Sequence, residues 1–232
     1  MASVAQPVDD HGLEALFRSL GANPALHARF INTISFMEYV GARKIMKSQM
    51  DTEFDLELLS HVAEEAKHAW LVKRLALRVD QAAAETYGPE HLLCPDEAEG
   101  YLQSIDAAAE AALADVDVTD AGCTKQWLNY LYSSLLIEER ADTFYKVYAV
   151  VLEEIGLAGT VRSILKDEIR HLAAMAERIE RYDVDARARL AGLRVTERAA
   201  FARWEKALWS EIHAAAAAAA PPSEVALGSA VH

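Results

Sequence analysis

Apolar residues recur every three or four positions along most of this chain, which is the spacing of amphipathic α-helices. The pattern predicts helices over residues 10–20, 24–50, 51–79, 121–154 and 159–181, and a last helix from 196 into the alanine run at 214–220. Residues typical of helix ends support these bounds, with Gly21 and Gly156 as stops and Asp51, Thr52 and Thr160 as N-caps. Alternating runs typical of β-strands are nearly absent, so we expect an all-α protein.

Residues 81–120 form a long stretch of mixed pattern with a modest helical segment at 97–113. We interpret this stretch as a crossover between two antiparallel helical hairpins. Such a chain is expected to form a four-helix bundle with one long crossover and extra helices at its N- and C-terminal ends. The expected organisation is a single helical domain over 1–220 and a flexible tail over 221–232.

The apolar stripe of each of the four long helices is interrupted near its middle by acidic residues or histidine. The inward positions include Glu38 in the first, Glu65 and His68 in the second, Glu138 in the third, and Glu168 and His171 in the fourth. A buried carboxylate is costly unless it is paired or bound to a metal. Four inward carboxylates therefore call for cations, and two divalent metals would balance four negative charges.

Two of these interruptions share the spacing Glu-x-x-His, at Glu65–His68 and at Glu168–His171. Side chains three residues apart on a helix project from the same face, so both members of a pair can reach one metal. Each pair follows a helix that carries an inward Glu. Carboxylate oxygens with one imidazole per metal favour iron, or else manganese, over a soft metal.

The six positions and the order of the helices resemble the ferritin-like superfamily of non-haem di-iron carboxylate proteins. This superfamily includes bacterioferritins, rubrerythrins, ribonucleotide reductase small subunits and aldehyde-deformylating oxygenases, and the resemblance covers residues 24–180. It implies that Glu38 and Glu138 are terminal ligands. It further implies that Glu65 and Glu168 bridge two iron ions, each of which also binds one histidine, His68 or His171.

The resemblance also gives a role to the acidic residues that directly precede the bridging ones. Glu64 and Asp167 are expected to hydrogen-bond His171 and His68 respectively, and so to orient the two rings. The terminal ligand of the third helix is open between two neighbours, because Glu139 follows Glu138. Glu138 is favoured, since Lys146 lies on the face of Glu139 and makes that face more polar.

Further residues near the expected centre have two interpretations each. His61 is an extra ligand or proton relay, or a core histidine held by a hydrogen bond. Asp142 and Tyr145 follow Glu138 by one and two turns and are expected in a polar network around it. Aromatic residues that could carry a radical or line a cavity, or simply fill the core, are Tyr39, Trp70, Tyr132, Tyr145 and Tyr148. Small residues that leave room for dioxygen or a substrate, or allow close helix packing, are Gly41, Ala42 and Ala141.

The net charge and the cysteine content limit the kinds of ligand that the protein is expected to bind. The net charge is −13, from 36 acidic and 23 basic residues, and it disfavours nucleic acid as a partner. Cys94 and Cys123 form no Cys-x-x-Cys pair, as expected for reduced thiols rather than a thiolate metal site. Without an evident secretory signal or a membrane-length apolar run, the expected location is cytoplasmic.

The activity implied by the resemblance is a di-iron oxidoreductase that uses dioxygen or peroxide to oxidise a small organic substrate, with an unidentified electron donor. The helices beyond the bundle favour this interpretation, because they can shape a substrate pocket. The alternatives are a ferroxidase or iron-storage protein, a rubrerythrin-like peroxidase, and a non-enzymatic bundle stabilised by metal. The chain lacks the Cys-x-x-Cys electron-transfer site of the peroxidase. A homodimer is compatible with each of these activities.

Overall fold

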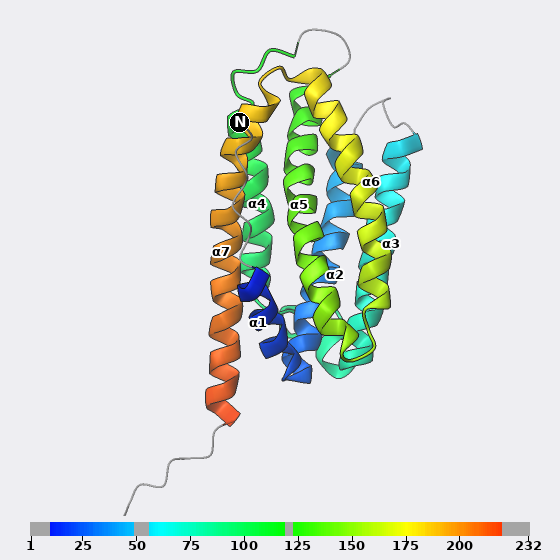
Figure 1. The fold of residues 1–232 in the computed structure, drawn as a ribbon, viewed down its shortest axis with the longest axis vertical. Helices are drawn as coiled ribbons and strands as arrows, with labels where there is room; N and C mark the ends of the chain where they lie inside the picture. Colours follow the sequence, from blue (N-terminus) through cyan, green and yellow to red (C-terminus); the bar gives the residue numbers. More distant parts are fainter. Residues whose placement is uncertain (1–9, 49–55, 119–122, 220–232) are drawn as a thin grey trace, which may run out of the picture.

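The structure, a computed structural model, describes residues 10–48, 56–118 and 123–219, and its regular elements in these ranges are all helical (Figure 1). The expected all-α class is therefore confirmed for this part of the chain. The α-helices are α1 Asp10–Gly21, α2 Pro24–Ser48, α3 Leu56–Val79, α4 Pro95–Ala112, α5 Lys125–Glu153, α6 Gly159–Tyr182 and α7 Ala186–Ala219. Two short 3-10 helices, η1 Ala82–Ala84 and η2 Pro89–His91, lie between α3 and α4.

Four of the helices surround the interior in which the acidic residues lie. Helix α2 packs on α3, α3 on α6, α6 on α5, and α5 on α2, so the four form a closed ring. The hairpins α2–α3 and α5–α6 each run antiparallel, and α4 and α7 lie together beside them (Figure 1). Helix α1 packs against α5 and α2.

The inward face of each central helix follows the expected spacing. On α6, for example, the buried residues are Val161, Ile164, Glu168, His171, Met175 and Ile179. Each central helix buries apolar side chains on both sides of its acidic or histidine positions, so a polar layer is enclosed within an apolar core. The energy of apolar burial therefore holds the polar layer in place.

The crossover between the hairpins is anchored to α2 by side chains that bind its backbone. Arg29 Nη2 donates to the carbonyl of Leu92 at 2.7 Å. Asn32 Nδ2 donates to the carbonyls of Thr86 and His91 at 2.7 and 2.8 Å. These part-buried bonds satisfy loop carbonyls and set the start of α4, which agrees closely with the expected segment 97–113.

The start of α7 differs from the expectation. The helix begins at Ala186, ten residues before the predicted start at Thr196. Asp183 accounts for the difference, because its Oδ1 accepts from the backbone N–H of Asp185 at 2.9 Å and its Oδ2 accepts from Arg189 Nε at 2.6 Å. These bonds hold the turn between α6 and α7, so a charged stretch that looked like a connection is the first part of a helix.

Other helix ends were predicted with mixed success. Gly156 has φ +70°, the left-handed conformation expected of a helix stop. Thr160 is not the cap of α6, because the cap position is Ala158 and has no side-chain cap hydrogen bond. The predicted caps Asp51 and Thr52 and the predicted tail at 221–232 lie outside the described residues.

A buried ion pair joins α5 to α7. Arg140 Nε and Nη2 donate to the two carboxylate oxygens of Glu197 at 2.8 and 2.7 Å, and the hydroxyl of Tyr101 on α4 donates to the same carboxylate at 3.0 Å. The pair fixes α4 and α7 against one side of the central ring.

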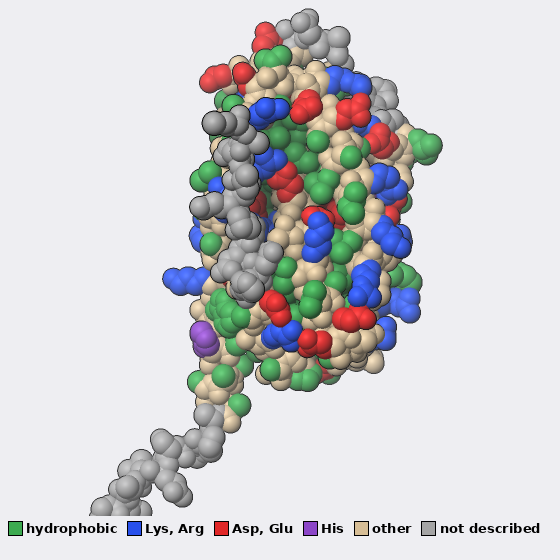
Figure 2. Space-filling view, in the orientation of Figure 1, with side chains coloured by type: hydrophobic (Ala, Val, Ile, Leu, Met, Phe, Trp, Pro, Cys, Tyr) green, Lys and Arg blue, Asp and Glu red, His purple; other side chains and the backbone are tan. Residues whose placement is uncertain are grey.

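Acidic and basic side chains are interspersed over the face of the molecule in Figure 2. Among the described helices, none has the length and apolar character needed to cross a membrane.

Candidate metal centre

Seven inward side chains from the four central helices meet at one level of the bundle. They are Glu38 of α2; His61, Glu65 and His68 of α3; Glu138 of α5; and Glu168 and His171 of α6. Six of the seven are buried, and the side chain of Glu38 is only 12% exposed. On α3 the spacing His-x-x-x-Glu-x-x-His covers two turns, which puts three of these side chains on one face.

The seven side chains form two groups that could each hold a metal ion. One group consists of Glu38, Glu65, His68 and Glu168, and the other of His61, Glu65, Glu138 and His171. Within each group the potential ligand atoms lie within 4.8 Å of one another. Glu65 belongs to both groups, and Oε2 of Glu168 lies 3.9 Å from Nδ1 of His171, so both acidic residues reach both halves.

Ring nitrogens and carboxylates approach one another closely inside the cluster, and several of their atoms have no hydrogen-bond partner. Nδ1 of His68 lies 3.3 Å from Oε1 of Glu168, and Nδ1 of His171 lies 3.7 Å from Oε1 of Glu138. Seven buried side-chain N or O atoms in the described residues have no hydrogen-bond partner, and four of them are in this cluster. Buried polar atoms normally have partners, so these four mark a place where cations fit.

Protons carry part of the charge balance within the cluster. Burial, together with the nearby Glu65, holds the pKa of Glu38 well above its ordinary value, and burial likewise raises the pKa of Glu138. Burial alone would lower the pKa of His61, but the carboxylates of Glu138 and Glu65 outweigh it and raise the value to about 10. Neighbouring carboxylates also raise the pKa of His68 to about 11 against the effect of burial. These carboxylates therefore favour protons on His61 and His68, whereas burial and the nearby His61 lower the pKa of His171.

Two acidic residues hydrogen-bond the histidine rings on the side that faces away from the cluster. Nε2 of His171 lies 2.7 Å from Oε2 of Glu64 on α3, and Nε2 of His68 lies 3.2 Å from Oδ2 of Asp167 on α6. Each acidic residue precedes the inward Glu of its own helix, so its side chain points sideways to the opposite helix. With Nε2 held by a carboxylate, Nδ1 of each ring faces the cluster as a potential ligand atom.

Two tyrosines contact the cluster through hydrogen bonds. The hydroxyl of Tyr145 donates to Oε1 of Glu38, and the hydroxyl of Tyr130 lies 2.8 Å from Nδ1 of His61. Nε2 of His61 faces inward, 3.0 Å from Glu138 and 3.6 Å from Glu65. Sequence analysis missed Tyr130, because its role depends on a contact between α5 and α3 that spacing within one helix does not reveal.

Several other candidates lie away from the cluster. Glu139 forms an ion pair with Arg194 of α7 at 2.5 Å, and Asp142 pairs with Lys146 at 2.6 Å and belongs to neither group. Four of the aromatic candidates do not contact the cluster. Tyr39 and Trp70 are exposed at the surface. Tyr132 and Tyr148 are buried, but their hydroxyl groups are hydrogen-bonded to Asp183 and His27 respectively. In the described part of the chain, neither Cys94 nor Cys123 belongs to a disulfide.

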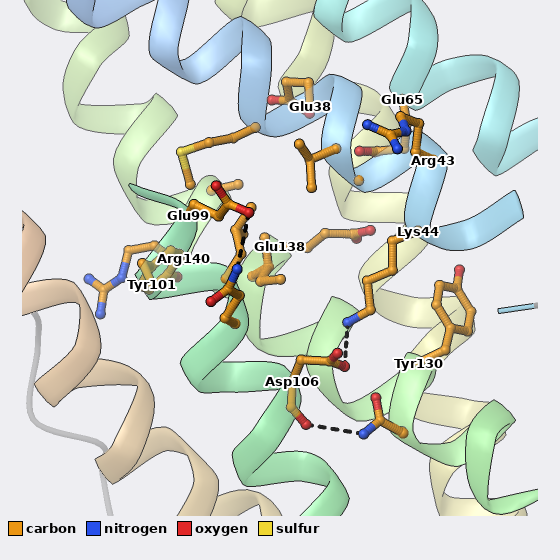
Figure 3. A pocket seen from close by; sticks show the side chains of 18 of the residues that line it. Glu38, Arg43, Lys44, Glu65, Glu99, Tyr101, Asp106, Tyr130, Glu138 and Arg140 are labelled. Atoms are coloured by element: carbon orange, nitrogen blue, oxygen red, sulfur yellow. Dashed lines mark hydrogen bonds and ion pairs between the residues drawn. The ribbon is translucent and has the colours of Figure 1, made fainter. Parts of the chain in front are cut away.

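A cavity of about 1290 Å³, here called the large cavity, lies between α2 and α5 on one side and α4 and α7 on the other. Its wall includes all four inward carboxylates, those of Glu38, Glu65, Glu138 and Glu168. Figure 3 shows three of these side chains around the space. Gly41 and Ala141 line it beside the centre, whereas the third small candidate, Ala42, is buried and does not. Gly41 gives Glu65 room, since an added Cβ would lie 3.0 Å from its Oε2 and the carboxylate would have to shift.

A smaller cavity of about 420 Å³ reaches the opposite, histidine side of the cluster between α3, α5 and α6. His61, Glu64, His171 and Tyr130 line it. Tyr130 lines both cavities, so this residue separates the two sides. The carboxylate side thus faces the larger space and the histidine side faces the smaller one.

Comparison of the chain with protein-family models, with curated proteins and with solved structures gave no match in any of the three.

Proposed function

We propose that this protein is a ferritin-like di-iron oxidoreductase that uses dioxygen or peroxide to oxidise an organic molecule held in the large cavity. The observation that carries the proposal is the buried cluster of four carboxylates and three histidines, whose four carboxylates line the wall of that cavity. A site that binds metal, is shielded by an apolar core and yet opens to a sizeable space has the parts that metal-assisted oxidation requires.

The donor set supports two metal ions and favours iron. Two divalent ions would bring four positive charges to the four carboxylates, so that the buried layer becomes neutral without protons. Oxygen and imidazole donors suit iron and manganese and disfavour soft ions. With His61 included, one group offers two histidines and the other one, so the two ions would have unequal surroundings.

The large cavity supports an organic substrate over iron storage. Helices α4 and α7 contribute one wall of it, and neither belongs to the central ring. The part of the wall next to the carboxylates is mainly apolar, with Ile34, Met37, Ile137 and Phe144. An apolar chamber holds an organic molecule by excluding water, whereas hydrated iron ions gain nothing from such a wall.

The residues around the centre would have distinct tasks. A reduced iron pair bound there would supply the electrons that activate dioxygen or peroxide. Glu64 and Asp167 hold the rings of His171 and His68 in one orientation, which fixes the ligand geometry. Tyr145 donates a hydrogen bond to Glu38, and the Tyr130 hydroxyl holds the ring of His61. Gly41 and Ala141 leave the approach from the cavity clear.

The test is oxygen uptake by the protein loaded with Fe(II) without air, with a chemical reductant and a set of small organic compounds. The proposal predicts catalytic oxygen uptake that rises with a suitable compound and yields its oxidised product, and Glu65→Gln should abolish it because Glu65 belongs to both groups. Oxidation of many Fe(II) ions per chain into a soluble mineral would instead identify a ferroxidase or storage protein. A protein that binds no iron would refute the proposal.

A further inference from the structure

We infer that the organic molecule is an anion with an apolar body, oriented with its carboxylate away from the metal centre. The inference rests on the proposed function and adds the chemical class and orientation of the ligand. It is drawn from the distribution of charged and apolar residues around the large cavity. Four basic residues, Arg43, Lys44, Lys47 and Lys125, line one end of this cavity and are here called the basic rim.

The basic rim lies where three helices end or begin together. Arg43, Lys44 and Lys47 are on the last turns of α2, and Lys125 is the first residue of α5. The end of α2, the end of α4 and the start of α5 lie at the same end of the molecule, uppermost in Figure 1. Four bases around one opening stand out in a chain whose net charge is −13. Their field attracts anions to an otherwise acidic protein.

Most of the basic rim has no carboxylate of its own. Arg43, Lys47 and Lys125 form no ion pair in the described part of the chain; Lys125 donates to the carbonyl of Ala114, and Arg43 lies over the ring of Tyr39. Of the three other acidic residues on the same walls, Asp106 is paired with Lys44, Glu99 accepts only from the uncharged amide of Gln103, and Glu110 is the third. Among the described lining residues outside the metal cluster, three unpaired bases therefore stand against two unpaired carboxylates, those of Glu99 and Glu110.

Lys44 reaches across the cavity from α2 to α4 and α5. Its ammonium donates to Oδ1 of Asp106 at 2.7 Å, as Figure 3 shows, and to Oγ of Ser133 at 2.8 Å. An ammonium group has three N–H donors, so one remains for a ligand oxygen. The side chain is 27% exposed, so a carboxylate there would be partly shielded from water and salt.

The opposite part of the cavity is suited to the apolar body. Ile34, Met37, Ile137 and Phe144 line it near the four carboxylates of the centre. Gly41 marks the level of the centre and Lys47 the basic rim, six residues further along α2, which is a rise of about 9 Å. A carboxylate at the basic rim would therefore put an alkyl chain of medium length beside the metals.

The test compares three molecules of equal length that differ in charge: octanoate, 1-octanol and octylamine. Their binding to the full-length protein is measured by calorimetry, both metal-free and loaded with redox-inactive Zn(II). We expect octanoate to bind about tenfold more tightly than octanol, a difference of about 1.4 kcal/mol, and octylamine to bind most weakly.

Charge reversal locates the head group. Lys47→Glu combined with Lys125→Glu should weaken octanoate about tenfold and leave octanol unchanged, which also shows that the variant is folded. Lys166→Glu is the matched control, because Lys166 is an exposed residue of α6 that does not line the cavity. Equal binding of octanol and octanoate, equal weakening of both, or binding of none of the three would overturn the inference. Metal content measured on the same samples tests the proposed function separately.

Discussion

Among single residues, Glu138 and its neighbour Glu139 show how one step along a helix decides a role. Glu138 is buried in the cluster, 3.0 Å from Nε2 of His61, whereas Glu139 is half-buried and paired with Arg194. Glu138→Gln and Glu139→Gln each replace one carboxylate oxygen by an amide nitrogen in the same helix. They therefore form a matched pair for testing which carboxylate holds metal.

We expect Glu138→Gln to weaken metal binding at least about tenfold, because an amide brings no negative charge to the second group. Its metal-free stability should be unchanged or higher, since burial holds the pKa of Glu138 well above its ordinary value and disfavours the charged form. Glu139→Gln should bind metal normally and lose less than about 1 kcal/mol of stability. Cobalt(II) titration and urea unfolding measure both quantities, and equal metal binding by the two variants would contradict the assignment.

Gly41 offers a second test of the centre. A Cβ at this position would lie 3.0 Å from Oε2 of Glu65, the far end of a flexible side chain that must then shift by a few tenths of an ångström. We expect Gly41→Ala to fold with equal or greater stability, because Ala favours helices by about 0.5–1 kcal/mol over Gly, and yet to bind metal less tightly.

Gly100→Ala is the control, since an added Cβ at Gly100 of α4 meets nothing within 4 Å. This variant should gain the helical stability and keep the metal affinity. Thermal unfolding and cobalt(II) titration of both variants distinguish the two effects. If Gly41→Ala bound metal as tightly as Gly100→Ala, the close approach at Glu65 would have no role in the site.

Among the elements, the attachment of α7 to α5 depends on the buried ion pair of Arg140 and Glu197. Arg140→Met leaves Glu197 buried without its cation, and we expect a loss of about 3–5 kcal/mol in the free energy of unfolding. Adding Glu197→Leu removes the uncompensated charge and should restore most of the loss. Urea denaturation measures both variants, and a double variant no more stable than Arg140→Met would contradict this account.

The packing of α2 on α5 contains a buried histidine that gives the fold a pH dependence. Burial lowers the pKa of His27 from 6.5 to about 4, and Nε2 of its ring lies 2.5 Å from the hydroxyl of Tyr148. The unfolded chain takes up the proton near pH 6.5, whereas the folded chain resists it. The stability from neutral His27 is therefore complete above pH 6.5 and is lost as the pH falls toward 4, by about 3 kcal/mol.

His27→Gln removes this proton and keeps a polar partner for Tyr148. We expect the unfolding free energy of the wild type, minus that of the variant, to fall as the pH is lowered from 6.5 to 4. Only the wild type has a histidine that is protonated more readily in the unfolded chain than in the folded one. Urea unfolding across this pH interval measures the difference in unfolding free energy. The contributions of the other titrating groups are the same in both proteins and cancel in this difference. A difference that stays constant with pH would show that His27 is not buried as described.

For the whole molecule, periodicity was enough to predict most helices and their inward faces. The stripes on α2, α3, α5 and α6 follow from spacing alone, because a helix buries whichever face is apolar. What spacing cannot supply is distance between helices. The membership of His61 in a metal group and its contact with Tyr130 both depend on how α3 and α5 approach each other.

The large cavity was beyond prediction for a similar reason. Its outer wall comes from α4 and α7, whose position depends on contacts made far apart in the chain, such as Arg29 with the carbonyl of Leu92 and Arg140 with Glu197. The sequence indicated that extra helices were present, but not that they stand beside the carboxylates. The early start of α7 was missed because the stretch is rich in charge and the turn before it is held by side-chain bonds of Asp183.

The central claim is a pair of metal ions held by this cluster, and Mössbauer spectroscopy of the protein loaded with iron-57 tests it most directly. We expect two irons per chain, one for each group, with two sets of Fe(II) signals because one group has two histidines and the other one. After exposure to air, the oxidised pair should be diamagnetic at low temperature, as coupled ferric ions are. A chain that binds no iron, or a single uncoupled ferric ion, would contradict the claim.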